Sequence, residues 1–256
     1  LASGDISGSQ KFIYTSPAKG ALKSLRGRSL YLDILLEHIV DEILEACHVS
    51  RSCLLYTGGG HFYLLLPNTT HTQAVLQKAD SLINDWFLQH YGTKLYIALA
   101  SEPCSADDFS VRGGGAGKVF QKVSKALGQK KLCRYDEQQL TALFDAQSRY
   151  NKDTDGSREC AICHTASPAA DLQPYGEDTG DGAEEACASC NALFRLGKSS
   201  LTASMFVISP SAGREGVPLP GLAQPYYLQA IREKELAAMD KPKRIYVKNE
   251  NTLGQA

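Results

Sequence analysis

The sequence lacks several features that would place it quickly in a broad class of proteins. No apolar run approaches the ~20 residues of a membrane-spanning helix, and no signal peptide is visible. The sequence also lacks a large excess of acidic or basic residues, because its net charge is −1 at pH 7. We therefore expect no membrane contact, and any contact with nucleic acid has to come from a local patch rather than from an overall field.

An initiator methionine is also missing. The chain starts at Leu1, inside what reads as the end of a strand, so we expect a piece of a longer protein. Its 43% hydrophobic and 21% charged residues are typical of a globular protein, and 256 residues suffice for one large or two modest domains. No Ser-His-Asp or Cys-His nucleophile arrangement stands out, which argues against nucleophilic catalysis.

Cysteine is present eight times, without signs of secretion. Four of the eight form two CxxC pairs, which favours metal binding in a reducing compartment over disulfides. The other four lie in apolar or amphipathic stretches and are expected to be small buried hydrophobic residues. These four are Cys47, Cys53, Cys104 and Cys133.

The two CxxC pairs predict a structural zinc site. Two such turns can place four thiolates tetrahedrally around Zn²⁺, and a closed site of this kind is not catalytic. The segment between Ser148 and Ala186 is poor in apolar residues and includes the acidic run Gly176–Glu185, so we expect its cysteines, not a core, to hold it. The alternative is a pair of redox or fortuitous CxxC sequences, and His164 is a weaker spare ligand. The predicted ligands are Cys160, Cys163, Cys187 and Cys190.

The first part of the chain has the pattern of an α+β domain. Its elements predict the ferredoxin-like order βαββαβ, an antiparallel sheet with helices on one face. Both strands of the hairpin are so continuously apolar that we expect them to be central and buried. The predicted elements are a strand over Leu1–Ile6, a short helix over Ser7–Tyr14, a basic connector over Lys19–Arg28, a helix over Ser29–Cys47, hairpin strands over Cys53–Tyr56 and Phe62–Leu66, a helix over Thr72–Tyr91 and a strand over Lys94–Ala100.

Later elements are less regular. We predict three domains: a palm-like nucleotide-binding domain over 1–147, a four-cysteine zinc domain over 148–198, and a connector over 199–256. Their further predicted elements are helices over Lys118–Leu127, Asp136–Ala146 and Pro225–Ala238, and strands over Leu201–Ser209 and Arg244–Lys248.

The hairpin turn and the end of the first strand form the second candidate site. A sheet of this kind with acids at those places is the palm of nucleotide polymerases and cyclases, where the acids hold two Mg²⁺ ions. Here Asp5 is present, but the hairpin offers Gly58, Gly59, Gly60 and His61 instead of acids. A palm that binds nucleotide without catalysis fits, with the amides of Ser7-Gly8 and the turn accepting phosphates. The alternative stays open that the glycines only make a tight turn and that Asp5 only caps a helix.

Two further motifs are weaker. Arg112–Lys118 resembles a phosphate-binding loop but has Arg112 where a glycine is required and Val119 where Ser or Thr is required. A basic strip could contact RNA phosphates or an acidic partner, although such strips are usually solvated helix faces. The strip consists of Lys118, Lys122, Lys125, Lys130, Lys131 and Arg134.

Several motifs in order resemble one family. They are Asp5–Tyr14, Leu22–Leu32, Leu55–Thr69, the two CxxC pairs and Arg244–Asn249. Over essentially the whole chain, these motifs resemble the large, polymerase-like subunit of type III-A CRISPR effector (Csm) complexes. The resemblance covers that family's first palm and zinc domain, without its HD nuclease domain and without the Gly-Gly-Asp-Asp hairpin of its second palm.

The resemblance implies a function in antiviral defence within a cytoplasmic, prokaryotic, RNA-guided complex. Full subunits of the family cut single-stranded DNA and, as transferases, join ATP into cyclic oligoadenylates with Mg²⁺ or Mn²⁺. Implied partners are the other Csm subunits, guide RNA, target RNA, the HD domain and the second palm. Carried over by position, the ATP pocket would comprise Asp5, Ser7, Gly8, Phe12 and Gly58–His61, and the four CxxC cysteines match the family's zinc ligands.

No catalytic residue is predicted in this chain, so we expect it to be inactive alone. A second class of function stays open, a scaffold that docks effector subunits or guide RNA without binding nucleotide. A free-standing zinc-ribbon binder of nucleic acid is the third, which the neutral overall charge argues against.

Overall fold

The computed structural model describes residues 1–17, 19–110, 115–148, 157–168, 171–175, 183–213, 215–239 and 241–248. The chain divides into two compact units: unit 1 comprises Leu1–Phe12 and Leu32–Asp153, and unit 2 comprises Ile13–Tyr31 and Thr154–Ala256. Unit 2 thus groups the predicted zinc domain with the predicted connector and with a segment near the start of the chain. Among the described residues, no helix combines the length and the apolar character needed to cross a bilayer.

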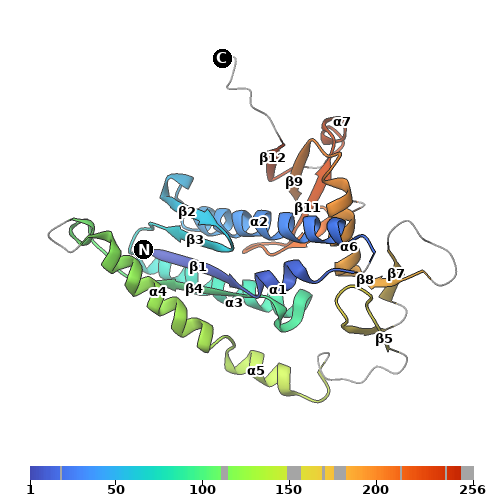
Figure 1. Cartoon of the computed structure of the whole chain (residues 1–256). Coiled ribbons are helices and arrows are strands. Elements are labelled where there is room, and N and C mark those ends of the chain that lie inside the picture. The colour runs from blue at the N-terminus through green and yellow to red at the C-terminus, as the bar shows by residue number, and fades with distance from the viewer. Residues whose placement is uncertain are drawn as a thin grey trace. The chain divides into compact units, whose positions relative to one another are not determined.

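Unit 1 is built on a four-stranded antiparallel sheet with the order β2-β3-β1-β4 (Figure 1). The α+β class predicted for this part of the chain is confirmed. Gly92 ends α3, as expected, with its N–H bonded to the Leu88 carbonyl. The elements from the start of the chain to residue 144 are β1 (Ala2–Ser7), α1 (Ser9–Tyr14), α2 (Ala21–Ala46), η1 (Arg51–Cys53), β2 (Leu54–Gly58), β3 (His61–Leu64), α3 (Thr70–Tyr91), η2 (Gly92–Lys94), β4 (Tyr96–Ser101), η3 (Asp107–Phe109), α4 (Ala116–Leu132) and α5 (Glu137–Phe144). The end of α1 and the part of α2 up to Tyr31 belong to unit 2.

The hairpin strands differ in position from the prediction. β3 is central, and Phe62 and Leu64 are fully buried, as expected. β2 is an edge strand instead, and Leu55 and Tyr56 are 46% and 54% exposed. An apolar run alone does not separate a central strand from an edge strand, because strand order depends on pairing with distant segments.

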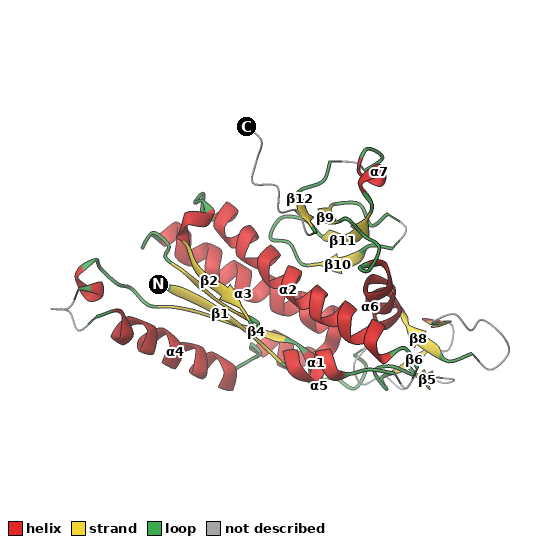
Figure 2. Cartoon of the chain, turned by 45° about the horizontal axis from the view of Figure 1, so that its top comes forward, coloured by secondary structure: helices red, strands yellow, loops and turns green. Residues whose placement is uncertain are grey.

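Helices cover both faces of this sheet, whereas the prediction placed them on one. Figure 2 shows α4 on the opposite side of the sheet from α3. Val119, Val123 and Leu127 of α4 pack against the β4 side chains Tyr96 and Ala98. The basic connector predicted before Ser29 is wrong as well, since α2 begins at Ala21.

Unit 2 contains a second antiparallel sheet with the order β10-β11-β9-β12 (Figure 2). The helix predicted over Pro225–Ala238 is wrong: its first half is a strand and its second half a single helical turn. From Tyr226 to Gln229 the strand alternates buried and partly exposed side chains, the period of a sheet that packs on one face. The elements are β9 (Met205–Ser209), β10 (Val217–Leu219), β11 (Tyr226–Ile231), α7 (Glu233–Leu236) and β12 (Arg244–Val247).

Two short hairpins and a helix precede that sheet, and two glycines bring this helix close to the first part of α2. A Cβ on Gly27 would lie 1.9 Å from the Leu193 carbonyl oxygen, and one on Gly197 would lie 1.9 Å from the Lys23 carbonyl oxygen. The two backbones therefore approach at a distance that only glycine allows. The elements are β5 (Ser157–Glu159), β6 (Ala166–Pro168), β7 (Leu172–Pro174), β8 (Glu185–Cys187) and α6 (Ala188–Ser199).

Candidate functional site

The predicted hairpin is present, and its strands extend to Gly58 and His61, so that only two residues form the turn. Gly58 pairs with His61, and Gly59 and Gly60 have φ of +61° and +86°. Positive φ at both central positions is the requirement of a type I′ turn. A Cβ on Gly59 would meet no atom within 4 Å, and one on Gly60 would come no closer than 3.7 Å to its surroundings. Gly59 therefore presents bare backbone to open space, whereas the Gly60 carbonyl accepts from the Ile6 N–H at 2.8 Å.

Asp5 lies beside this tip, paired with His61 across β1 and β3. Its Oδ2 lies 3.0 Å from His61 Nδ1, and its Oδ1 lies 3.0 Å from Nζ of Lys131 on α4. The hydrogen bond with His61 and the hydrogen bond and charge of Lys131 hold the pKa of Asp5 below its usual value of 3.8, against partial burial. Both carboxylate oxygens thus have cationic or proton-donating partners.

The second ring nitrogen of His61 contacts Ser3. The Nε2 atom of His61 lies 3.0 Å from Ser3 Oγ, which makes a chain of acid, imidazole and hydroxyl. Ser3 is only 1% exposed, and its hydroxyl donates to the Phe62 carbonyl at 2.6 Å. A hydroxyl in this position cannot reach a substrate, so the chain fixes the orientation of His61 and does not form a nucleophile.

The remaining predicted nucleotide-site residues lie on the segment that follows Asp5. Ser7 ends β1, and Gly8 has φ of +87°. A Cβ on Gly8 would lie 2.1 Å from the Lys94 carbonyl oxygen, so close packing alone explains this glycine. Phe12 is 4% exposed and packs edge-to-face against Tyr91, with ring centroids 5.2 Å apart. A role for these residues in binding ATP stays a prediction.

The basic strip is partly engaged in unit 1. Lys130 pairs with Asp80 at 2.7 Å, Lys131 pairs with Asp5, and the Arg134 guanidinium lies 5.8 Å from the centre of the Tyr96 ring. Residues 112–114 of the weak phosphate-loop motif lie outside the described residues, and Ala116–Lys118 form the start of α4. The sequence did not indicate Lys131 as a partner of Asp5, because the two are far apart in the chain and no local pattern links them.

In unit 2, the four predicted zinc ligands come together. Cys160 follows β5, Cys163 lies in the next turn, Cys187 ends β8 and Cys190 lies in the first turn of α6. Their four Sγ atoms lie within 4.8 Å of one another, and the Cys163 and Cys187 sulfurs are 3.9 Å apart. Zinc–sulfur bonds of ~2.3 Å in a tetrahedron give a sulfur–sulfur edge of ~3.8 Å. The donor set and its spacing fit a structural zinc ion.

The surroundings of the sulfurs suit thiolates. Backbone N–H groups of Ile162, Cys163 and Cys187 point at Cys160 Sγ at 3.3–3.5 Å. Four thiols this close cannot all be deprotonated without a cation. In the absence of a metal, some of the sulfurs therefore donate hydrogen bonds as thiols and others accept them as thiolates. Despite an opposing contact with Cys163, hydrogen bonds from Cys187 and Cys190 lower the pKa of Cys160 to about 5. Contacts with the other cysteine sulfurs also lower the pKa of Cys163 and raise those of Cys187 and Cys190.

An arginine from α2 completes the cluster. Arg28 is 2% exposed, and its Nη2 donates to Cys190 Sγ at 3.0 Å. A buried cation beside a thiolate favours the deprotonated form that metal binding requires. No local signal marked Arg28, which the sequence placed in a basic connector.

Two details of the predicted zinc domain change. The cysteines do not hold the segment alone, because Ile162, Leu172, Tyr175 and Phe194 pack around Cys160 and Cys190 in a small apolar core. His164 is not part of the cluster; its Nδ1 lies 3.8 Å from a Glu159 carboxylate oxygen on an exposed surface. The acidic run from Gly176 lies mostly outside the described residues.

These observations define a class of protein: an α+β domain with an open glycine turn beside a paired aspartate, in a chain that also carries a four-cysteine metal-type centre. Comparison with known proteins identifies the family. The model of Csm1 subunit domain B matches residues 1–147. The chain belongs to the Cas10/Csm1 family of type III-A CRISPR systems.

Curated relatives agree over the whole chain. The chain is 34% identical over 270 residues to the Cas10/Csm1 single-strand-specific deoxyribonuclease (subtype III-A) of Mycobacterium tuberculosis, covering 100% of this chain and 32% of that protein. The corresponding protein of Enterococcus italicus is 34% identical over 258 residues, covering 100% of this chain and 31% of that protein. The chain thus spans about a third of the length of these relatives.

Solved structures support the fold. A Csm1–Csm4 subcomplex of the type III-A interference complex aligns with a TM-score of 0.62 and 23% identity, covering 90% of this chain and 26% of that chain. A Csm1–Csm4 cassette in complex with pppApApA aligns with a TM-score of 0.52 and 30% identity, covering 57% of this chain and 20% of that chain.

Proposed function

We propose that unit 1 is a palm of ferredoxin-like topology that binds one ATP molecule at the turn Gly58–His61. In this proposal a second palm, outside the 256 residues, supplies the metal-binding acids and joins ATP into cyclic oligoadenylate with Mg²⁺ or Mn²⁺. The open backbone of Gly59 in the turn beside Asp5 carries the proposal. The antiparallel order β2-β3-β1-β4 and the pppApApA-bound relative support it.

The state of Asp5 supports a binding role without catalysis. Nucleotide transfer by two metal ions needs several carboxylate oxygens that are free to coordinate them. Here the two oxygens of Asp5 are held by His61 and Lys131. We therefore assign no catalytic metal to this palm and expect the chain alone to make no oligoadenylate.

The DNase activity named for the relatives is proposed only for a full-length subunit. Among the described residues, the four cysteines are the one group of at least three potential metal ligands that lie close enough to share an ion. We propose that these cysteines hold a structural zinc ion. Csm4 and the other Csm subunits, with guide and target RNA, are the proposed partners of the full subunit.

A scaffold function without nucleotide is the second candidate. The observation that favours it is the ion pair between Asp5 and Lys131. In this pair the charge of Lys131 is engaged by Asp5 instead of facing a nucleotide phosphate. Amide hydrogen exchange with and without Mg²⁺–ATP separates the two candidates. ATP binding predicts slower exchange at Gly59, Gly60 and His61, whereas unchanged exchange at these amides favours the scaffold.

A further inference from the structure

A cavity of about 580 Å³ lies along the free edge of β4. β4 is the last strand of its sheet and pairs with β1 on one side only. Its residues Leu99–Ser101 line the cavity, with Leu76 and Gln77 of α3 and Gln129 of α4 among the other lining residues. The proposed nucleotide function does not use this groove.

The backbone of β4 alternates between β1 and the groove. Leu1 and Glu102 exchange both backbone hydrogen bonds, each at 2.9 Å, so Glu102 faces β1. In an antiparallel ladder every second residue turns its N–H and C=O the other way. Ile97, Leu99 and Ser101 therefore turn theirs away from β1, and Leu99 and Ser101 line the groove.

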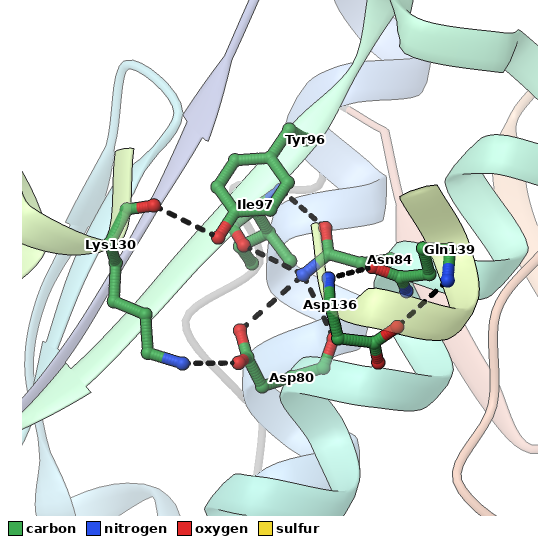
Figure 3. A network of polar contacts seen from close by, with 7 residues as sticks. All are labelled: Asp80, Asn84, Tyr96, Ile97, Lys130, Asp136 and Gln139. Carbon is green, nitrogen blue, oxygen red and sulfur yellow. Dashed lines mark hydrogen bonds and ion pairs between the residues drawn. The ribbon is translucent and has the colours of Figure 1, made fainter. Parts of the chain in front are cut away.

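At Ile97 a side chain takes the place of a neighbouring strand (Figure 3). Asn84 of α3 accepts from the Ile97 N–H at 2.9 Å and donates to the Ile97 carbonyl at 3.0 Å. Beside it, Lys130 of α4 reaches across to Asp80 of α3 at 2.7 Å (Figure 3). The two helices thus close the edge of β4 at this point.

Further along the strand the edge is open. Among the described residues, no hydrogen bond reaches the outward N–H or C=O groups of Leu99 and Ser101. These residues are spaced by two, so their outward groups repeat at the period of an extended chain. At the next such residue, Ile97, the amide of Asn84 already occupies the pairing position beside the strand.

We propose that this groove binds an extended, uncharged peptide segment of a partner protein, which adds to the sheet beside Leu99–Ser101. Extended peptides recognise exposed strand edges through backbone hydrogen bonds, with alternate side chains entering pockets. Asp80 and Lys130 are the only charged side chains in the lining and neutralise each other, so a charged segment gains nothing here. Apolar side chains of the segment would meet Leu76 and Ala126, and polar ones Gln77 and Gln129.

The test selects linear peptides from a random display library against the 256-residue chain and maps the enriched ones by amide hydrogen exchange. The proposal predicts slower exchange at Leu99 and Ser101. Ser101→Pro removes one outward N–H without breaking a bond to β1, and proline is tolerated on strand edges. It should lower the affinity about tenfold, as expected for one lost pairing bond and local misfit.

The control variant Ser101→Thr keeps the N–H group and should bind as the wild type does. N-methylation of the peptide at the residue that faces Leu99 should weaken binding without changing any side chain. Three results would overturn the proposal: no enriched peptide, enriched peptides that leave exchange at Leu99 and Ser101 unchanged, or equal binding to the Ser101→Pro and Ser101→Thr variants. A groove that binds small molecules but enriches no peptide would also overturn the proposal.

Discussion

Lys131 Nζ lies 3.0 Å from Asp5 Oδ1, an ion pair that joins α4 to the end of β1. Together with His61 on the other oxygen, it gives each carboxylate oxygen a proton-donating partner. The acid that the sequence marks as a possible metal ligand is therefore paired with two side chains of its own domain. This state can be tested directly.

A Mn²⁺ titration followed by amide NMR should detect no metal site at Asp5. Paramagnetic broadening at Asp5 and His61 should not exceed that at Asp107, an exposed carboxylate away from the tip. Lys131→Met removes the competing cation and should increase broadening at Asp5. Strong broadening at Asp5 in the wild type would contradict our assignment of a metal-free palm.

Acid stability should depend on Asp5. Because its folded pKa lies below the unfolded value of about 3.9, it contributes stability that is fully present above that value and lost as pH falls through the folded pKa. Urea unfolding of the wild type should thus show a decline in the free energy of unfolding between about pH 5 and pH 2. In Asp5→Asn the decline should be shallower. Parallel curves for the two proteins would mean that the ion pair and the His61 contact contribute nothing.

Elemental analysis of the purified chain should find about one zinc ion, as a closed four-cysteine site binds. Cys160→Ser removes a buried ligand and should abolish stoichiometric zinc and speed proteolysis between Ser157 and Ser199, leaving the β1–β4 sheet folded. Cys133→Ser is the matched control, because Cys133 lies outside the cluster and is exposed, so that its predicted burial is wrong. A zinc-free chain with the same protease resistance as the zinc-bound one would contradict the assignment.

The packing of α6 against the first part of α2 should depend on Gly197 having no Cβ atom. Gly197→Ala would place Cβ 1.9 Å from the Lys23 carbonyl and should cost about 1–3 kcal/mol of stability. Gly128→Ala in α4 meets no atom within 4 Å and should stabilise by about 0.5–1 kcal/mol. Thermal unfolding of the two variants should shift in opposite directions, and equal shifts would show that the close approach is not rigid.

Features encoded by neighbouring residues could be predicted from the sequence. The hairpin needs only consecutive glycines between apolar runs, and each CxxC pair places two sulfurs on one turn. The tetrahedral coordination of zinc by four sulfurs then predicts that the two CxxC pairs lie close together. Helix α3 also followed its apolar period to its end at Gly92.

Long-range pairings could not be predicted in this way. Arg28 reaches Cys190 across 162 positions, and Lys131 reaches Asp5 from another helix. A single charged side chain carries no periodic signal, so nothing in its neighbourhood names its partner. For the same reason the sequence alone did not predict that β2 is an edge strand or that α4 covers the second face of the sheet. Both features depend on the order of the strands.

ATP affinity at the hairpin tip tests the central claim most directly. Gly59→Asn gives an Asn-Gly turn, which type I′ hairpins favour, so the fold should persist while the side chain enters the open space over the tip. Gly59→Asp adds a negative charge in the same place. Calorimetric titration with Mg²⁺–ATP should show binding by the wild type, weaker binding by Gly59→Asn and the weakest by Gly59→Asp. No binding by the wild type, or equal affinity in all three proteins, would contradict a nucleotide site at Gly58–His61.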